Sequence, residues 1–383
     1  MLAPEADATQ RGPTGIACVL RGPGDLQLET YPVLDPGPGG MLLRTEAAAI
    51  CASDVHAYRG KSLSTVEYPV IMGHENVGTV VALGVGVDRD WTGARLAVGD
   101  RVVSWQVASC YECYFCRVLN EPTLCRKQDV IGYSFSADRE PYFCGGYAQY
   151  VNLPSPRFPV FKTHLEADIG VLAIPAGEAL NTLETGWLRR GETVVVQGVG
   201  LQGLMCVAWA RKLGAERVIA VGAPTNRLLL ANDLGADDCL DISDGQSSEE
   251  RIAAVRSLTP NRYGADLVVQ CSGAPAALSE GLAYVRDGGR MVDMGHAADL
   301  GVFSLDVPRE LVVRRVHLLA GWSCTPERVL RAIRLLEAAD FDWHRLVSHH
   351  VPLSRVGEGL EAMESGYVLD GRGVVRIVVR PWE

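Results

Sequence analysis

The sequence predicts an α/β chain with a β-rich, barrel-like part up to about residue 175 and a doubly wound parallel sheet after it. Two patterns predict this division. In the first part, short apolar runs are separated by Gly, Pro and Asp, and helical periodicity is scarce. From Glu178 onward, apolar strands alternate with helical stretches, which is typical of a parallel sheet with helices on both faces.

The β-rich part contains four apolar runs that we expect to be strands of a mostly antiparallel sheet. They are Met41–Leu43, Val77–Leu83, Arg101–Trp105 and Tyr147–Leu153. The segment before them, residues 1–15, carries acids and no apolar core. It predicts a loose tail, not a secretory signal.

The second part alternates as a βαβ unit should. Thr193–Gln197 and Arg217–Val221 are predicted strands, followed by the predicted helices Leu201–Leu213 and Arg227–Leu234. Further strands, an amphipathic helix and a closing strand are predicted at Asp266–Gln270, Arg290–Met294, Pro326–Ala339 and Gly373–Val379.

Composition narrows the functional classes. The 383 residues suffice for two or three domains, and 48% hydrophobic with 21% charged residues is typical of a soluble enzyme. The 46 acidic and 36 basic residues give a formal charge of −10, which argues against a nucleic-acid or anionic-membrane surface. Since no run of about 18 apolar residues occurs, we expect no membrane span. We expect a cytoplasmic protein whose eleven cysteines stay reduced.

Four cysteines, Cys110, Cys113, Cys116 and Cys125, lie within sixteen residues. Two residues between successive thiols allow a tight turn to aim the sulfurs at one point, and the fourth thiol can complete a tetrahedron. Four thiolates with no open position are typical of a structural zinc site. The alternatives are four buried cysteines, two disulfides or an iron–sulfur cluster, which fits the loop less well.

A second set of metal ligands is divided between two short segments. Cys51 lies in one, and His74 with Glu75 lies in the other. Thiolate, imidazole and carboxylate together are the ligands of a catalytic zinc, which makes an alcohol easier to deprotonate and polarises a carbonyl. Each residue taken alone has an ordinary alternative explanation. A single cysteine is often a small core residue, and a His–Glu pair often forms a hydrogen bond at the surface. Together they favour a metal site.

Ser53 and His56, which follow Cys51 in the sequence, suggest a path for proton transfer. They follow Cys51 by two and five residues. A hydroxyl beside the substrate oxygen, followed by an imidazole near the surface, could carry a proton to solvent.

A glycine-rich turn joins a predicted strand to a predicted helix, in the order Gly198, Val199, Gly200, Leu201, Gln202, Gly203. This context turns a weak motif into a dinucleotide-binding prediction. Gly198 permits the tight turn, Gly200 lets the backbone approach a pyrophosphate, and Gly203 allows close helix–strand packing. The helix N-terminus would hold the phosphates. The alternative is a crossover without a ligand.

The second strand of this unit ends at Gly222, where a carboxylate would favour NAD. No acid stands there to repel a 2′-phosphate, and Arg227 could attract one, which favours NADP. Equally, Arg227 could be the first basic residue of a solvated helix. The cofactor is left as NAD or NADP.

Six motifs in order carry a resemblance. They are ICASDVH (50–56), GHENVG (73–78), VGDRV (98–102), the four-cysteine knuckle, GGYAQYV (145–151) and GVGLQG (198–203). With them the chain resembles the zinc-containing medium-chain dehydrogenase/reductase family, which includes alcohol, sorbitol and threonine dehydrogenases. The similarity extends from about Gly15 to Val379. It also includes Cys271 and Ser272, which become cofactor-binding candidates.

The resemblance implies a GroES-like catalytic domain (1–176 and 320–383) and a Rossmann NAD(P)-binding domain (177–319), with the active site in the cleft between them. It implies reversible hydride transfer between NAD or NADP and a small-molecule secondary alcohol, polyol or ketone. Cys51 and His74 become zinc ligands, Glu75 a direct or switchable ligand, and Ser53 with His56 the proton relay. One catalytic and one structural zinc are implied, in a homodimer or homotetramer.

One departure concerns the third zinc ligand. Relatives have Cys or Glu where this sequence has Ile174, which cannot bind zinc. Glu178 lies one helical turn later on the same face, so it could replace the ligand, face the nicotinamide, or only cap the helix. Otherwise Cys51, His74 and Glu75 alone would hold the ion. The departure keeps two alternatives open: a non-redox lyase, cyclase or epimerase, and a cofactor-binding homologue without activity.

Overall fold

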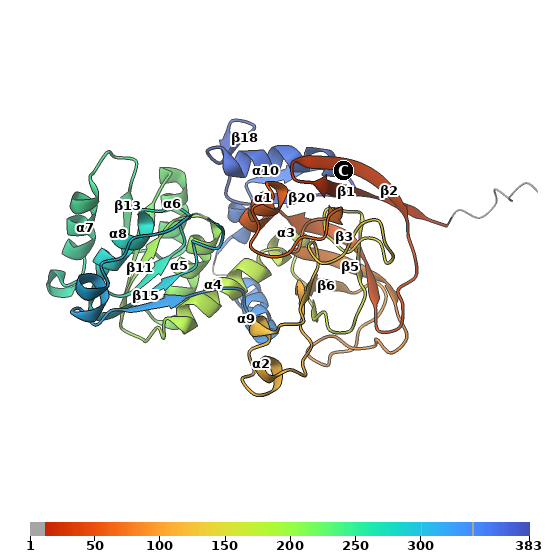
Figure 1. Ribbon diagram of the computed structural model, residues 1–383, viewed down its shortest axis with the longest axis horizontal. Coiled ribbons are helices and arrows are strands. Elements are labelled where there is room, and N and C mark those ends of the chain that lie inside the picture. Colours follow the sequence, from red (N-terminus) through yellow and green to blue (C-terminus); the bar gives the residue numbers. More distant parts are fainter. Residues whose placement is uncertain (1–11, 300, 339–340) are drawn as a thin grey trace, which may run out of the picture.

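The computed structural model describes residues 12–299, 301–338 and 341–383, and these form two lobes (Figure 1). One lobe is β-rich and the other contains the parallel sheet. Helices α4 (Ala173–Thr185) and α9 (Pro326–Glu337) lie between them. The tail residues 1–11 and Ala339, the predicted end of the amphipathic helix, lie outside the described residues.

The β-rich lobe is built on a seven-stranded, mostly antiparallel sheet. Each of the four predicted runs overlaps one of its strands, although Trp105 and residues 147–149 lie outside them. Its order is β10 (Val160–Lys162), β6 (Arg101–Ser104), β5 (Asn76–Leu83), β3 (Met41–Ala49), β20 (Ile377–Val379) and β17 (His349–Val351), with β9 (Tyr150–Leu153) also paired to β3. A three-stranded sheet adds β2 (Asp25–Pro32), β1 (Thr14–Gly22) and β4 (Val70–Ile71).

The chain's last strand belongs to this lobe, because β20 pairs with β3. It is shorter than the predicted strand 373–379. Gly373, the first residue of that segment, instead ends a small hairpin of β18 (Val368–Leu369) and β19 (Arg372–Gly373), and residues 374–376 lie outside any strand. Figure 1 shows this hairpin above the junction of the lobes, beside α10 (Val356–Glu364).

The second lobe is a six-stranded sheet in which every neighbouring pair is parallel. Its order is β13 (Asp238–Asp241), β12 (Arg217–Gly222), β11 (Thr193–Gln197), β14 (Ala265–Gln270), β15 (Val285–Asp293) and β16 (His317–Ala320). It is packed by α5 (Leu201–Leu213), α6 (Thr225–Asp233), α7 (Ser248–Ser257) and α8 (Ala277–Tyr284). Since the strand order reverses at β11, a ligand is expected outside its carboxyl end.

One hydrophobic core continues through both lobes. It includes Val77 and Trp105 of the β-rich lobe, buried residues of α4 and α9, and Val194 of the parallel sheet. The Trp209 indole donates a hydrogen bond of 2.7 Å to the carbonyl of Ala176 in α4. Helix α4 is therefore fixed between the lobes. Within the described ranges, no helix is long and apolar enough to cross a membrane.

Candidate active site and metal centres

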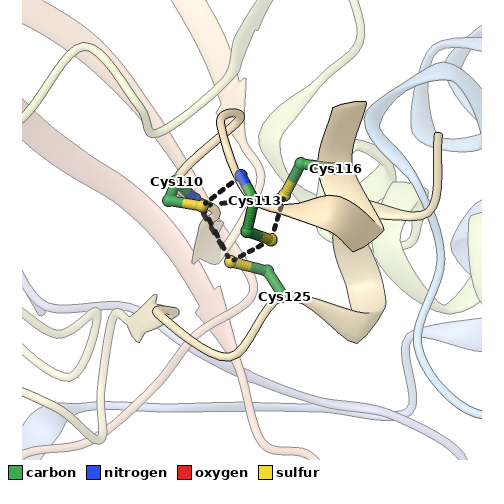
Figure 2. A group of neighbouring side chains, drawn as sticks. All are labelled: Cys110, Cys113, Cys116 and Cys125. Carbon is green, nitrogen blue, oxygen red and sulfur yellow. Dashed lines mark hydrogen bonds between the residues drawn. The ribbon is translucent and has the colours of Figure 1, made fainter. Parts of the chain in front are cut away.

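The knuckle cysteines form a closed group of four sulfurs (Figure 2). Neighbouring sulfurs are 3.4 Å apart for Cys110–Cys125 and 3.5 Å for Cys113–Cys116. The pairs Cys110–Cys116 and Cys113–Cys125 are both 3.9 Å apart. Zinc–sulfur bonds of about 2.3 Å in a tetrahedron place the sulfurs about 3.8 Å apart. The group therefore has the size of a tetrahedral zinc site.

Local backbone geometry prepares these thiols. The amides of Cys113 and Lys127 donate to the sulfurs of Cys110 and Cys125, at 3.4 and 3.3 Å. Backbone hydrogen bonding, first of all from the amide of Glu112, lowers the pKa of the Cys110 thiol to about 6. A thiolate is the form that binds metal. The residues fit a structural zinc and leave it no open position.

The second predicted cluster also assembles. Ligand atoms of Cys51, His74 and Glu75 lie within 4.8 Å of one another. Cys51 is the N-cap of α1 (Ala52–Tyr58), and the other two residues lie in the link between β4 and β5. Two chain segments separated by more than twenty residues thus converge on one point.

A buried carboxylate, which the sequence reasoning missed, orients this cluster. Asp54 Oδ1 lies 3.2 Å from His74 Nδ1. Its other oxygen accepts hydrogen bonds from the Cys51 amide at 2.9 Å and the Tyr147 hydroxyl at 2.6 Å. Asp54 therefore contacts one nitrogen of His74 and leaves Nε2 for a metal, as metal-binding histidines require.

The electrostatics of the cluster favour a cation. Burial by itself lowers the pKa of His74, but the Asp54 carboxylate and the Cys51 thiol outweigh it, so that pKa lies well above its usual range. Burial raises the pKa of Cys51, yet the His74 imidazole brings it below its usual value. The site thus holds more negative than positive charge, and its donor set fits zinc.

Glu75 has a second partner that is far away in sequence. Its carboxylate forms an ion pair with Arg376, and both side chains are buried. Arg376 also donates to the carbonyl of Ile50 at 3.0 Å. The arginine therefore holds Glu75 beside the residue that precedes Cys51.

Both predicted relay residues lie on α1, one turn apart and on the same face. The Ser53 hydroxyl is 3.4 Å from His74 Nε2. His56 is half-buried, and burial followed by the charge of Lys61 lowers its pKa. The Tyr133 ring packs against His74 with centroids 5.5 Å apart. Its buried hydroxyl lies near the Ser53 side chain.

Glu178 lies outside the three-residue ligand cluster. It is on α4, where the Gln202 side chain donates a hydrogen bond to its carboxylate. Burial raises its pKa to about 7, although the charge of His74 and the Gln202 amide act in the opposite direction. Ile174, one turn earlier, is 1% exposed. Glu178 therefore contacts the glycine-rich turn through Gln202, and the charge of His74 acts on its carboxylate.

The glycine-rich turn has the shape that a pyrophosphate needs. Gly198 has φ +97°, and a Cβ on Gly203 would lie 1.8 Å from the Gly198 carbonyl oxygen, so neither tolerates a side chain. Gly200 caps α5 and has nothing within 4 Å of the Cβ position. Open space at a helix N-terminus fits a phosphate group. Val199 and Leu201 flank Gly200 in the same turn.

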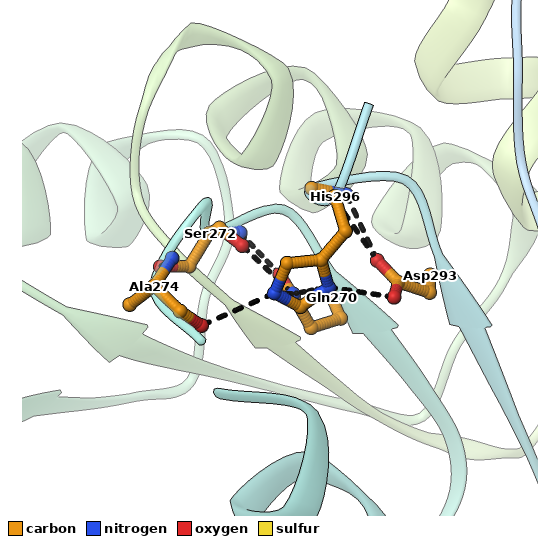
Figure 3. Close-up of polar contacts among 6 residues, drawn as sticks. Gln270, Ser272, Ala274, Asp293 and His296 are labelled. Atoms are coloured by element: carbon orange, nitrogen blue, oxygen red, sulfur yellow. Dashed lines mark hydrogen bonds and ion pairs between the residues drawn. The ribbon is translucent and has the colours of Figure 1, made fainter. Parts of the chain in front are cut away.

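A polar network, missed in the sequence, supports Cys271 and Ser272 at the carboxyl end of β14 (Figure 3). The buried Gln270 amide accepts a hydrogen bond from the Ser272 amide and donates one of 2.7 Å to its carbonyl. His296 lies 2.7 Å from Asp293 and 3.1 Å from the Ala274 carbonyl. The network fixes the loop beside the glycine-rich turn, where the Cβ of residue 198 would meet Ser272.

Gly222 and Arg227, the two residues expected near the adenosine ribose, differ in how well their positions fit that expectation. Gly222 ends β12, as predicted. Arg227 is 7% exposed, so it is not on a solvated helix face. Its guanidinium donates to the Val374 carbonyl and lies 4.6 Å from the centre of the Tyr367 ring. As a nucleotide ligand Arg227 remains a prediction, and its guanidinium has other partners here.

A β-rich lobe with zinc ligands, joined to a dinucleotide-binding sheet, is typical of a class of metal-dependent dehydrogenases. Comparisons of this chain with known protein families support that class. Residues 37–163 match the alcohol dehydrogenase GroES-like domain, and residues 202–338 match the zinc-binding dehydrogenase domain. The erythritol/L-threitol dehydrogenase of Mycolicibacterium smegmatis is 34% identical, over 91% of this chain and 94% of that protein.

Solved structures show the same architecture. An alcohol dehydrogenase from Thermotoga maritima has a TM-score of 0.89 and 30% identity, over 97% of this chain and all of its own. The structure of a putative zinc-binding dehydrogenase from Sinorhizobium meliloti, bound to NADP, has a TM-score of 0.83 and 26% identity. The match covers 96% of this chain and 100% of that one. The chain belongs to the zinc-containing medium-chain dehydrogenase/reductase family. It is an alcohol dehydrogenase/reductase whose cofactors are zinc and NAD or NADP.

Proposed function

We propose that this enzyme transfers hydride between NAD or NADP and a secondary alcohol, a polyol or the matching ketone. The observation that carries the proposal is the contact between Glu178 and Gln202. This contact supports a position of the predicted nucleotide turn near the cluster of Cys51, His74 and Glu75, because the charge of His74 acts on the same Glu178 carboxylate. A substrate oxygen at the metal cluster and a nicotinamide held by the turn would then share one cleft.

The chain's own residues would position the reaction and move its proton. When bound, zinc supplies a Lewis acid and the nicotinamide supplies or accepts the hydride. Asp54 keeps His74 in a fixed orientation. Ser53, next to His74, accepts or returns the substrate proton. His56, one helical turn away and half-buried, exchanges that proton with solvent.

The polar groups around the cluster favour a substrate with more than one oxygen. The Tyr133 hydroxyl lies near Ser53 and His74, and the Gln202 side-chain oxygen is buried without a hydrogen-bond partner among the described residues. A buried polar group without a hydrogen bond costs about 1–3 kcal/mol, so a substrate that supplies the missing bond gains affinity. Vicinal hydroxyls would satisfy these groups, and a relative acts on erythritol and L-threitol according to its name.

For the metal shell, we propose that Cys51, His74 and Glu75 are the side-chain ligands and that Glu178 is not one. Zinc per chain, measured by elemental analysis on wild type, Cys51→Ser and Glu178→Ala, tests this assignment. We expect two zinc ions in wild type and in Glu178→Ala, and one in Cys51→Ser. NADH and NADPH titrations on the same samples report whether the nucleotide site is intact.

The outcomes separate the alternatives. One zinc in Glu178→Ala would make Glu178 the replacement ligand. One zinc in wild type would favour a homologue without a catalytic metal. Conversion of substrate without any change in NAD(P) redox state would support the lyase, cyclase or epimerase alternative.

We further propose that the protein is cytoplasmic and forms a homodimer or homotetramer. We propose β16 as the strand through which two copies meet.

A further inference from the structure

A carboxylate lies beside the expected ribose site, on a strand that the sequence analysis did not consider. Strand β13 ends at Asp241, which pairs with Gly222 at the end of β12. The Ile242 amide also donates to the Gly222 carbonyl, at 3.1 Å. In doubly wound sheets the ligand lies outside the carboxyl ends of the strands, and the end of the second strand reads the ribose 2′ position. Asp241 is thus next to that position.

The usual place for a selecting carboxylate is closed in this chain. A Cβ on Gly222 would lie 2.6 Å from Val199 Cγ2 and 3.0 Å from the Val199 nitrogen. Both atoms belong to the glycine-rich turn, which cannot move without losing its own shape. A side chain at residue 222 would therefore require Val199 to shift, and the carboxylate beside the ribose position in this chain comes from a neighbouring element.

Asp241 is held in an orientation toward the N-terminus of α6. One of its oxygens accepts a hydrogen bond of 2.5 Å from the Thr225 hydroxyl. The other accepts from the Ser243 amide at 2.9 Å and the Ser243 hydroxyl at 2.5 Å. These bonds, first that of the Ser243 hydroxyl, lower the pKa of Asp241, so it is ionised at neutral pH.

The nearby cation does not neutralise this carboxylate. Arg227 lies two residues beyond Thr225, but its guanidinium contacts Val374 and Tyr367 of the C-terminal segment. That contact buries the arginine against the other lobe. The end of β13 therefore presents a negative charge beside the N-terminus of α6, while the guanidinium of Arg227 in α6 is engaged elsewhere.

We propose that Asp241 selects NAD over NADP. This inference rests on the proposed function as a nicotinamide-dependent dehydrogenase. The 2′-phosphate of NADP carries close to two negative charges at neutral pH, and it would lie beside the Asp241 carboxylate. The 2′-hydroxyl of NAD carries none and can donate a hydrogen bond to that carboxylate. The preference for NAD is thus set by one acidic residue at the end of the edge strand β13.

The test is fluorescence titration of NADH and NADPH on the zinc-loaded full chain. We expect wild type to bind NADH at least about tenfold more tightly than NADPH. Asp241→Asn should reduce this ratio about tenfold, mainly through tighter NADPH binding. Asp241→Ser, which keeps a hydroxyl for Thr225, should act in the same direction if the first variant folds poorly. Asp244→Asn changes an exposed acid three residues beyond Asp241; it is the matched control and should leave the ratio unchanged.

Salt gives a second readout. Higher ionic strength should weaken the discrimination in wild type and change it little in Asp241→Asn, because the repulsion is electrostatic. Equal or tighter NADPH binding by wild type would overturn the inference while leaving the dehydrogenase function standing. An unchanged ratio in both Asp241 variants would also overturn it. If neither nucleotide binds, the proposed function fails and the inference fails with it.

Discussion

At the scale of single residues, the metal cluster depends on a side chain with no metal-binding role of its own. Asp54 is fully buried, and it contacts His74 on one side and Tyr147 with the Cys51 amide on the other. A buried carboxylate needs such partners because leaving water is costly. Its negative charge makes His74 a better ligand and fixes the ring.

Replacing Asp54 with Asn should therefore weaken the catalytic zinc site without removing a ligand. We expect about 10–100-fold lower zinc affinity, the range for partners that support a metal ligand. Competition with a chromogenic chelator measures it. Tyr147→Phe is the comparison variant, because it removes one hydrogen bond to Asp54 and keeps the charge. Unchanged zinc affinity in Asp54→Asn would show that the carboxylate does not act through His74.

At the scale of elements, the knuckle is a short segment that zinc must organise. Its only helices are α2 (Tyr114–Arg117) and a 3-10 turn at Pro122–Leu124, and neither is long enough to be stable alone. Tyr114, Val118 and Leu124 are exposed, so little apolar burial supports the segment. The four sulfurs are its principal link, and a metal among them supplies the folding energy.

Cys125→Ser should thus lower thermal stability and remove one zinc per chain, while the nucleotide site stays intact. We expect a lower Tm, one zinc by elemental analysis, and NADH binding close to that of wild type. Cys239→Ser changes an exposed cysteine outside the knuckle and serves as the control, with no expected change in zinc or Tm. Loss of both zinc ions, or loss of none, would contradict a separate structural site.

At the scale of the whole molecule, the parallel sheet ends in two edge strands, β13 and β16, and the second of them has the exposed apolar surroundings. Strand β16 is last in the sheet order, and its residues are mostly exposed. Exposed apolar side chains lie on it and around it: Leu318, Val312, Val313 and Trp322. An edge strand with an apolar surface readily pairs with another chain, and twofold pairing of identical edges closes a dimer.

We therefore expect wild type to run at twice or more the 41.3 kDa mass of one chain in size-exclusion chromatography with light scattering. Leu318→Asp places a charge on the edge strand and should shift the population toward single chains. Leu63→Asp, at an exposed position of the β-rich lobe, should leave the mass unchanged. A single-chain mass for wild type at micromolar concentration would refute the expected assembly.

The sequence by itself determined the elements and the chemistry that depends on local spacing. Strand Thr193–Gln197 and helix Leu201–Leu213 have the predicted bounds because apolar periodicity and the glycines act within a few residues. The knuckle and the Cys51, His74, Glu75 set were predicted for the same reason, since their ligand spacing is legible in short segments. Helix α6 begins at Thr225, two residues before the prediction, because its first turn contains no apolar residue.

Only the tertiary structure decided which distant side chains meet. Arg376 reaches Glu75 across about 300 residues, Gln202 reaches Glu178 across 24, and Asp241 reaches Thr225 across 16. No period or spacing encodes such contacts, because they follow from how strands order in a sheet and how two lobes pack. For the same reason Arg227, a plausible phosphate ligand in the sequence, proved to contact the C-terminal segment. Local spacing sets the ligand types, and packing sets which charges face the cofactor.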